Sequence, residues 1–104
     1  MGRLRDKQTE FARAVPRLID AAFVLGYEVT LGDCFRDARC AYGSSKTLHR
    51  KRLAFDLNLF KDGKYLRQSK DYKKLGRYWE SIGGKWGVIR DGEQVDGNHF
   101  EWPE

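Results

Sequence analysis

Two histidines, each near an aspartate in the chain, are the residues whose types and spacing could do chemistry. His49 stands seven residues before Asp56, and His99 stands three residues after Asp96. A catalytic zinc site uses three ligands from His and carboxylate side chains and leaves a fourth position for water. A further carboxylate, not bound to the metal, is needed to take a proton from that water and pass it to the leaving amine. Two histidines and two aspartates therefore suffice for three ligands and one general base.

The segment around Asp56 is predicted to be a strand with one buried face. Four apolar residues alternate there with Ala54, Asp56 and Asn58: Leu53, Phe55, Leu57 and Leu59. Successive side chains of a strand point to opposite faces, so Asp56 points away from the core, toward solvent or a cleft. His49 precedes this strand and can turn its ring toward the same face. Residues 97–98 are interpreted as a two-residue turn that brings Asp96 and His99 to one point.

The elements that must position these residues can be predicted from periodicity and breakers. Apolar residues at helical spacing predict a helix over residues 7–25, kinked or broken at Pro16 and ended by Gly26. We expect further elements as follows: a strand at 27–31, a hairpin turn at 61–64, a helix at 70–82 and short strands at 86–89 and 99–102. Helices and strands mix without a βαβ rhythm, which favours one α+β domain, residues 1–104, with an antiparallel sheet.

The composition is that of a small soluble globular protein with a basic surface. The chain has 104 residues, 40% hydrophobic and 34% charged, with a formal net charge of +5. This charge attracts any polyanion and does not choose among them. The basic run at 50–52 could be a nucleic-acid patch, but no helix-turn-helix or aromatic stacking motif accompanies it. With no apolar run of signal-peptide or membrane-spanning length, we expect a cytosolic product, in which Cys34 and Cys40 are reduced thiols without a chemical role.

Several segments, in the same order and spacing, resemble the M15 family of zinc peptidases. Residues 47–56 are similar to its Ser-x-His-x-x-Gly-x-Ala-x-Asp pattern, with Thr47 in place of the serine and Arg52 in place of the glycine. Residues 96–101 match its second motif, an acidic residue, two spacers and His, then Phe-Glu. Residues 79–87 look like the tryptophan-glycine stretch of its endolysin branch, and residues 32–36 like the segment with its cleft arginine. The resemblance spans about residues 8–102.

The resemblance implies a role for each site residue. His49, Asp56 and His99 would be the zinc ligands, Asp96 the general base, and Arg36 a group that binds substrate or stabilises the oxyanion. It also implies the compact α+β fold of hedgehog-type peptidase domains. The implied substrate is a peptidoglycan stem peptide, cut between L-alanine and D-glutamate by a phage or prophage endolysin that reaches the wall through a membrane pore. We expect a monomer that binds no nucleic acid and does not associate stably with membranes.

Two other functions remain open at this point. A D-alanyl-D-alanine carboxypeptidase of the same family would trim a terminal residue, and a non-catalytic module would only bind wall polymer or nucleic acid. Two further side-chain roles also have alternatives. Glu101 shares strand parity with His99 and could orient its ring, although a plain surface glutamate is the favoured interpretation. Trp79 and Trp86 are predicted to be core or cleft-wall residues.

Overall fold

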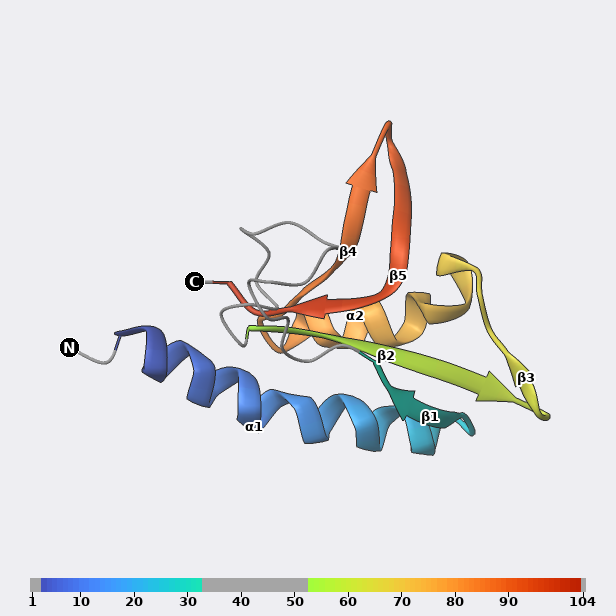
Figure 1. Ribbon diagram of the computed structural model, residues 1–104, viewed down its shortest axis with the longest axis horizontal. Helices are drawn as coiled ribbons and strands as arrows, with labels where there is room; N and C mark the ends of the chain where they lie inside the picture. The colour runs from blue at the N-terminus through green and yellow to red at the C-terminus, as the bar shows by residue number, and fades with distance from the viewer. Residues whose placement is uncertain (1–2, 33–52, 104) are drawn as a thin grey trace, which may run out of the picture.

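The computed structural model describes residues 3–32 and 53–103, and these form a small α+β domain with an antiparallel sheet, as predicted (Figure 1). The elements in chain order are α1 (Arg3–Val24), β1 (Glu28–Leu31), β2 (Ala54–Lys61), β3 (Lys64–Tyr65), the 3₁₀ helix η1 (Ser69–Tyr72), α2 (Lys73–Ser81), β4 (Lys85–Arg90) and β5 (Glu93–Glu101).

The sheet places the two strands with the candidate residues side by side in its middle. The strand order is β1-β2-β5-β4, with the short β3 paired to the far end of β2. Each pair is antiparallel. The predicted hairpin turn joins β2 to β3, where Asp62 and Gly63 adopt positive φ angles of 54° and 77°. β2 and β5, remote in sequence, are thus direct neighbours.

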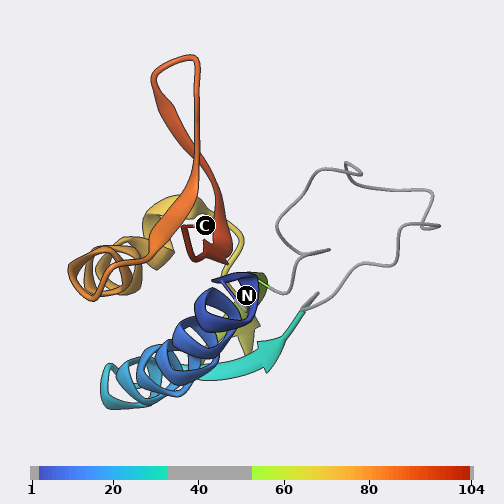
Figure 2. The ribbon, with the colours of Figure 1, turned by 90° about the vertical axis from the view of Figure 1, so that its left-hand side faces the viewer.

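One face of this sheet is covered by both α-helices, which lie on the same side in the turned view of Figure 2. Phe55 of β2 and Phe100 of β5 point to this side, and each contacts the ring of Trp79 from α2. Phe11 of α1 packs edge-on against both Phe55 and Trp79. Trp79 is fully buried, so it is a core residue as predicted.

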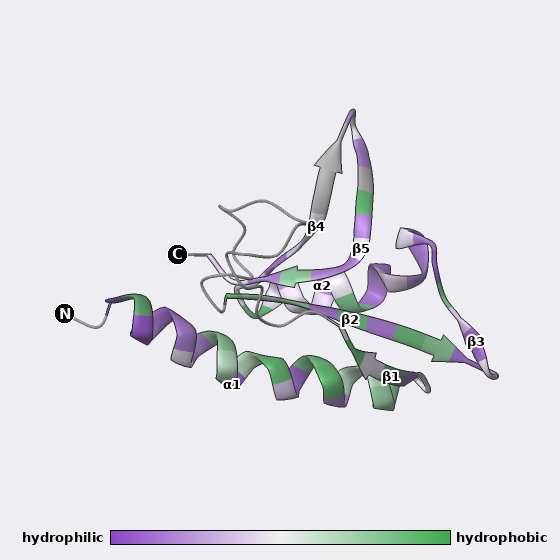
Figure 3. Cartoon of the chain, in the orientation of Figure 1, coloured by the Kyte–Doolittle hydropathy of each residue, from purple (hydrophilic) through white to green (hydrophobic). Residues whose placement is uncertain are grey.

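The first helix is longer than predicted and is not broken at Pro16. It begins at Arg3, four residues before the predicted start. Residues 3–6 are three charged residues and the exposed Leu4, so they add no buried position to the apolar pattern, but they are compatible with a helix. Proline removes one helical hydrogen bond, but a buried stripe runs past it on both sides and holds the helix against the sheet: Phe11, Ala14, Leu18 and Ala22. Figure 3 shows the alternation of hydrophobic and hydrophilic residues along α1 and β2. Among the described helices, none has the length and apolar character needed to cross a bilayer.

The prediction of a turn at residues 97–98 is wrong, since these residues lie within β5. β5 is irregular there: one residue of β4, Gly87, faces four of β5, residues 96–99. The bulge is fixed from the helix side of the sheet. The Trp86 indole N–H donates to the Gly97 carbonyl at 2.6 Å, and the Gly97 N–H donates to Ser69 Oγ at 3.0 Å. These tertiary contacts override the turn preference of the Asp-Gly-Asn sequence.

Candidate metal and catalytic site

Asp56 lies on the face of the sheet opposite the helices, as the alternation in β2 predicts. Leu53, Phe55, Leu57 and Leu59 are all at most 1% exposed on the helix side. The Asp56 side chain is 23% exposed on the other face. The buried apolar residues therefore fix the direction of the Asp56 carboxylate, because a shift of β2 by one residue would exchange the two faces.

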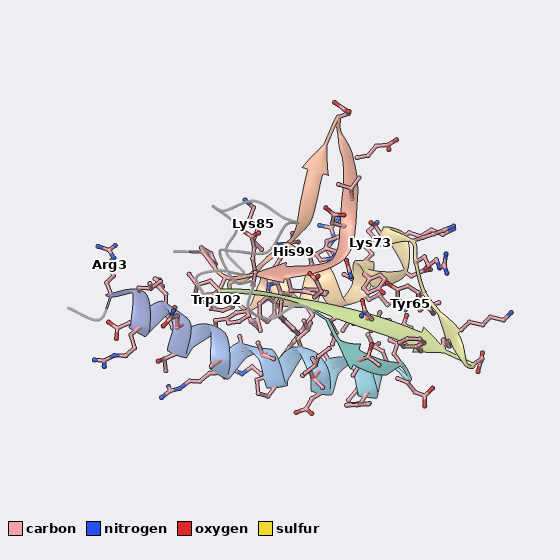
Figure 4. All side chains as sticks on the ribbon, viewed as in Figure 1. Arg3, Tyr65, Lys73, Lys85, His99 and Trp102 are labelled. Carbon is pink, nitrogen blue, oxygen red and sulfur yellow. The ribbon has the colours of Figure 1, made fainter. Side chains whose placement is uncertain are left out.

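His99 lies directly opposite Asp56 on the neighbouring strand. The register between β2 and β5 pairs these two residues, and residues that pair in this way point to the same face. Figure 4 shows His99 near the middle of the sheet, where β5 runs beside β2. Its Nδ1 is 3.5 Å from Asp56 Oδ1, and its side chain is 15% exposed. The fold thus brings together two of the three predicted zinc ligands, which are 43 positions apart in the chain.

Glu101 contacts the other nitrogen of the same ring, so the favoured interpretation as a plain surface glutamate is wrong. Its Oε1 is 2.7 Å from His99 Nε2, and its side chain is only 18% exposed. The main chain of Glu101 is held in place, because the Trp79 indole N–H donates to its carbonyl oxygen at 2.9 Å. Period-two alternation predicts that Glu101 shares the face of His99. It does not predict that the ring lies against the carboxylate.

The two carboxylates give His99 an unusual affinity for protons. Burial by itself lowers the pKa of His99, but hydrogen bonds and charge interactions with Asp56 and Glu101 outweigh it and raise the pKa to about 9. In the metal-free protein the imidazole is therefore charged at neutral pH. Such a site attracts a positive charge, whether proton or metal ion.

Polar side chains continue from Asp56 along the same face. The Asn98 amide donates to Asn58 Oδ1 at 3.0 Å, and the Asn58 amide is 3.4 Å from Thr30 Oγ1. The Tyr65 hydroxyl lies 3.4 Å from Asn58 Oδ1. Asn58 could be placed on this face from the alternation in β2. Asn98 could not, because the bulge in β5 changes the alternation there.

The end of β1 approaches Asp56 closely. The Gly32 N–H donates to the Asp56 carbonyl oxygen at 2.8 Å. A Cβ atom on Gly32 would lie 2.9 Å from the Asp56 Cβ, so a larger residue cannot be accommodated without a shift. The close approach of β1 to Asp56 therefore requires a residue without a Cβ atom at position 32.

Asp96 is exposed and lies in the β5 bulge, three residues before His99. It adopts a positive φ of 53°, a conformation that aspartate and asparagine tolerate better than most residues. The described residues contain no group of three or more His, Cys, Asp or Glu side chains that could hold a metal ion, so Asp96 does not form one with Asp56 and His99. Asp96 is thus not grouped with the pair as a third metal ligand.

Several predicted residues lie outside the described part of the chain. These are His49, Arg36, Cys34, Cys40 and the basic run at 50–52. The third predicted zinc ligand and the predicted oxyanion-binding arginine therefore stay predictions.

The separation of Asp56 and His99 fits a shared zinc ion. Two ligands on a tetrahedral zinc ion, each about 2.0–2.2 Å from the metal, are about 3.4 Å apart. The observed Nδ1–Oδ1 distance of 3.5 Å is close to that value and is longer than an ordinary N–H···O hydrogen bond. An imidazole and a carboxylate are also a suitable donor set for zinc. With a third ligand such as His49, this pair could complete a catalytic site.

Comparison with known proteins adds no family to this description, since no protein-family model and no curated protein matches the chain. The molecule is therefore defined by its own features. Its described residues form a small α+β domain in which the sheet face opposite α1 and α2 presents a histidine between two carboxylates.

Proposed function

We propose that this protein is a zinc peptidase that hydrolyses peptide bonds of bacterial peptidoglycan. The observation that supports this most is the placing of Asp56 and His99. They face each other in register at a separation suited to zinc, with a carboxylate on the far nitrogen of the imidazole. Metal-binding histidines usually donate their second N–H to such a carboxylate or to a carbonyl group.

In this proposal each predicted residue has one task. Asp56, His99 and His49 hold the zinc ion, which supplies Lewis acidity to a peptide carbonyl and lowers the pKa of water. Asp96 accepts the proton of the attacking water and delivers it to the leaving amine. The Asp96 side chain is exposed, so it is accessible to both the water and the amine. Arg36 binds substrate or stabilises the negative charge on the carbonyl oxygen.

The proposed substrate is the stem peptide of the wall, and the proposed bond is that between L-alanine and D-glutamate. This specificity rests on the resemblance of residues 47–56, 79–87 and 96–101 to the endolysin branch of the M15 peptidases. Two features suit the substrate. The face that holds Asp56 is polar, with the amide groups of Asn58 and Asn98 hydrogen-bonded to each other, and the net charge of +5 favours approach to an anionic wall.

Metal analysis coupled to a wall-lysis assay tests the proposal. The purified protein should contain about one zinc ion per chain and should reduce the turbidity of a suspension of isolated cell walls. A chelator should abolish this activity, and added zinc should restore it. Lysis that is unaffected by chelator, or a protein that binds walls without cleaving them, would contradict the proposal. The second result would favour the non-catalytic binding module.

Analysis of the products on defined muropeptides tests the bond. Cleavage between L-alanine and D-glutamate releases a new amino terminus on D-glutamate. Release of free D-alanine would instead identify a D-alanyl-D-alanine carboxypeptidase and would overturn the endopeptidase assignment, while the zinc-peptidase assignment would stand.

A further inference from the structure

The contact between Glu101 and His99 has the features of a fixed hydrogen bond, not of a loose surface pair. The Oε1–Nε2 distance is 2.7 Å, and the two side chains are only 18% and 15% exposed. Exposed ion pairs usually form between mobile side chains and have little effect. Here the strand is anchored on both sides of the ring, because Glu101 pairs with Ala54 and His99 pairs with Asp56.

The chemistry of this contact determines which ring nitrogen carries a hydrogen. An ionised carboxylate can only accept a hydrogen bond, so His99 Nε2 must be the donor. The remaining nitrogen, Nδ1, is the one that faces Asp56 Oδ1. When the imidazole is neutral, its lone pair is therefore on Nδ1 and is directed toward the aspartate.

The distances also separate the roles of the two carboxylates. Ligands that share a tetrahedral zinc ion lie about 3.4 Å apart. The 3.5 Å separation on the Asp56 side fits this value, and the 2.7 Å separation on the Glu101 side is too short for it. The Glu101 distance is that of a charge-assisted hydrogen bond.

We propose that Glu101 is a positioning residue, which holds the His99 ring so that Nδ1, and not Nε2, is presented to the metal beside Asp56. This inference rests on the proposed zinc function and deepens it. Glu101 acts through His99 and does not contact the metal. Its carboxylate fixes the rotation of the ring before the metal arrives, and it retains the hydrogen on Nε2 when Nδ1 gives up its proton to ligate the metal.

Two substitutions separate this role from a general contribution to the fold. Glu101→Gln replaces the carboxylate with an amide whose oxygen can still accept the hydrogen bond from Nε2. Glu101→Leu keeps a side chain of similar size but removes the hydrogen-bond acceptor. The matched control is Glu93→Leu, at an exposed position of the same strand. Thermal unfolding of each metal-free variant shows whether it is folded.

The experiment measures zinc affinity by competition with a chromophoric chelator, and identifies the ligating nitrogen from the ¹⁵N shifts of the imidazole rings. The full chain has only two histidines, so the ring spectrum is simple. We expect ligation through His99 Nδ1 in the wild type. Glu101→Leu should weaken zinc binding about 10- to 100-fold and lose the preference for Nδ1. Glu101→Gln should stay within a few-fold of the wild type, and Glu93→Leu should equal it.

Each contrary result has a distinct meaning. Wild-type ligation through His99 Nε2 overturns the proposal, and this holds even if Glu101→Leu does not fold. Wild-type zinc affinity and Nδ1 ligation in Glu101→Leu overturn the positioning role while leaving the zinc site intact. A wild-type protein that binds no zinc overturns the proposed function and this inference with it.

Discussion

Gly32 lies so close to Asp56 that a Cβ atom on the glycine would be 2.9 Å from the Cβ of the aspartate. We therefore expect Gly32→Ala to displace β1 or the Asp56 side chain. Overpacking of this kind costs about 1–3 kcal/mol. Gly32 has no positive φ that an alanine would strain, so the effect is steric alone. Chemical denaturation should show reduced stability, and zinc titration should show reduced affinity. Unchanged stability and unchanged zinc affinity would mean that the end of β1 adjusts to the alanine without cost.

Removal of either described ligand should abolish metal binding. Asp56→Ala and His99→Ala each delete one side of the pair that is 3.5 Å apart. Zinc content after dialysis should fall below detection in both variants, and wall lysis should be lost. Glu93→Ala, which deletes an exposed carboxylate of β5, should retain zinc. Stoichiometric zinc in His99→Ala would place the metal elsewhere in the chain.

Asp96→Asn should abolish hydrolysis and leave zinc bound, because an amide cannot act as the general base. Asparagine suits the positive φ of 53° at this position, so the backbone should not be strained. Asp91→Asn is a matched control, since Asp91 is also exposed and has the same φ. The turnover number and the zinc content of both variants provide the test. If Asp96→Asn were as active as Asp91→Asn, Asp96 would not be the base.

Zinc binding should displace protons from His99 at neutral pH. The pKa of this residue is raised to about 9 by Asp56 and Glu101, which outweigh the effect of burial, so the imidazole must lose a proton before it can ligate zinc. The apparent zinc affinity should therefore rise with pH until about 9. Calorimetric titrations in two buffers of different ionisation enthalpy would measure the protons released. An affinity that does not change between pH 7 and 9 would contradict this prediction.

The stability of the metal-free protein should show the opposite pH dependence. Because the folded-state pKa lies above the unfolded value of about 6.5, the folded state binds more protons between these two values. The stabilisation is fully present below pH 6.5 and is lost as the pH rises through 9, by at most about 3 kcal/mol. Urea denaturation with chelator present should show this decline in the wild type. His99→Gln should reduce it, and an equal decline in that variant would assign it to other groups.

The sequence was sufficient to predict the elements whose patterns are local. The alternation from Leu53 to Leu59 predicted both the strand and the direction of Asp56, and the turn residues at 61–64 predicted the hairpin. Pairing between remote strands has no such local signal. The structure was needed to show that Asp56 and His99 face each other, because this depends on the register between β2 and β5.

The errors have a common physical cause in tertiary contacts. Residues 97–98 have the composition of a turn, but Trp86 and Ser69 hold Gly97 within β5. Glu101 has the parity of an exposed strand residue, but the His99 ring lies against it. Trp86 and Ser69 thus determine the conformation at Gly97, and His99 determines the burial of Glu101. The preferences of single residues could not reveal either contact.

The bulge in β5 makes the chain between Asp96 and His99 sensitive to length. It also requires glycine at position 97, where a Cβ atom would lie 2.6 Å from Ser69 Cα. Deletion of one residue there would either pull Gly97 away from Ser69 or exchange the two faces of the strand beyond it. If the faces were exchanged, the His99 imidazole would point into the hydrophobic core and the Phe100 ring would be exposed to solvent. A substitution at Asn98 would change a side chain without changing the strand register, whereas a shortened or lengthened segment would separate His99 from Asp56.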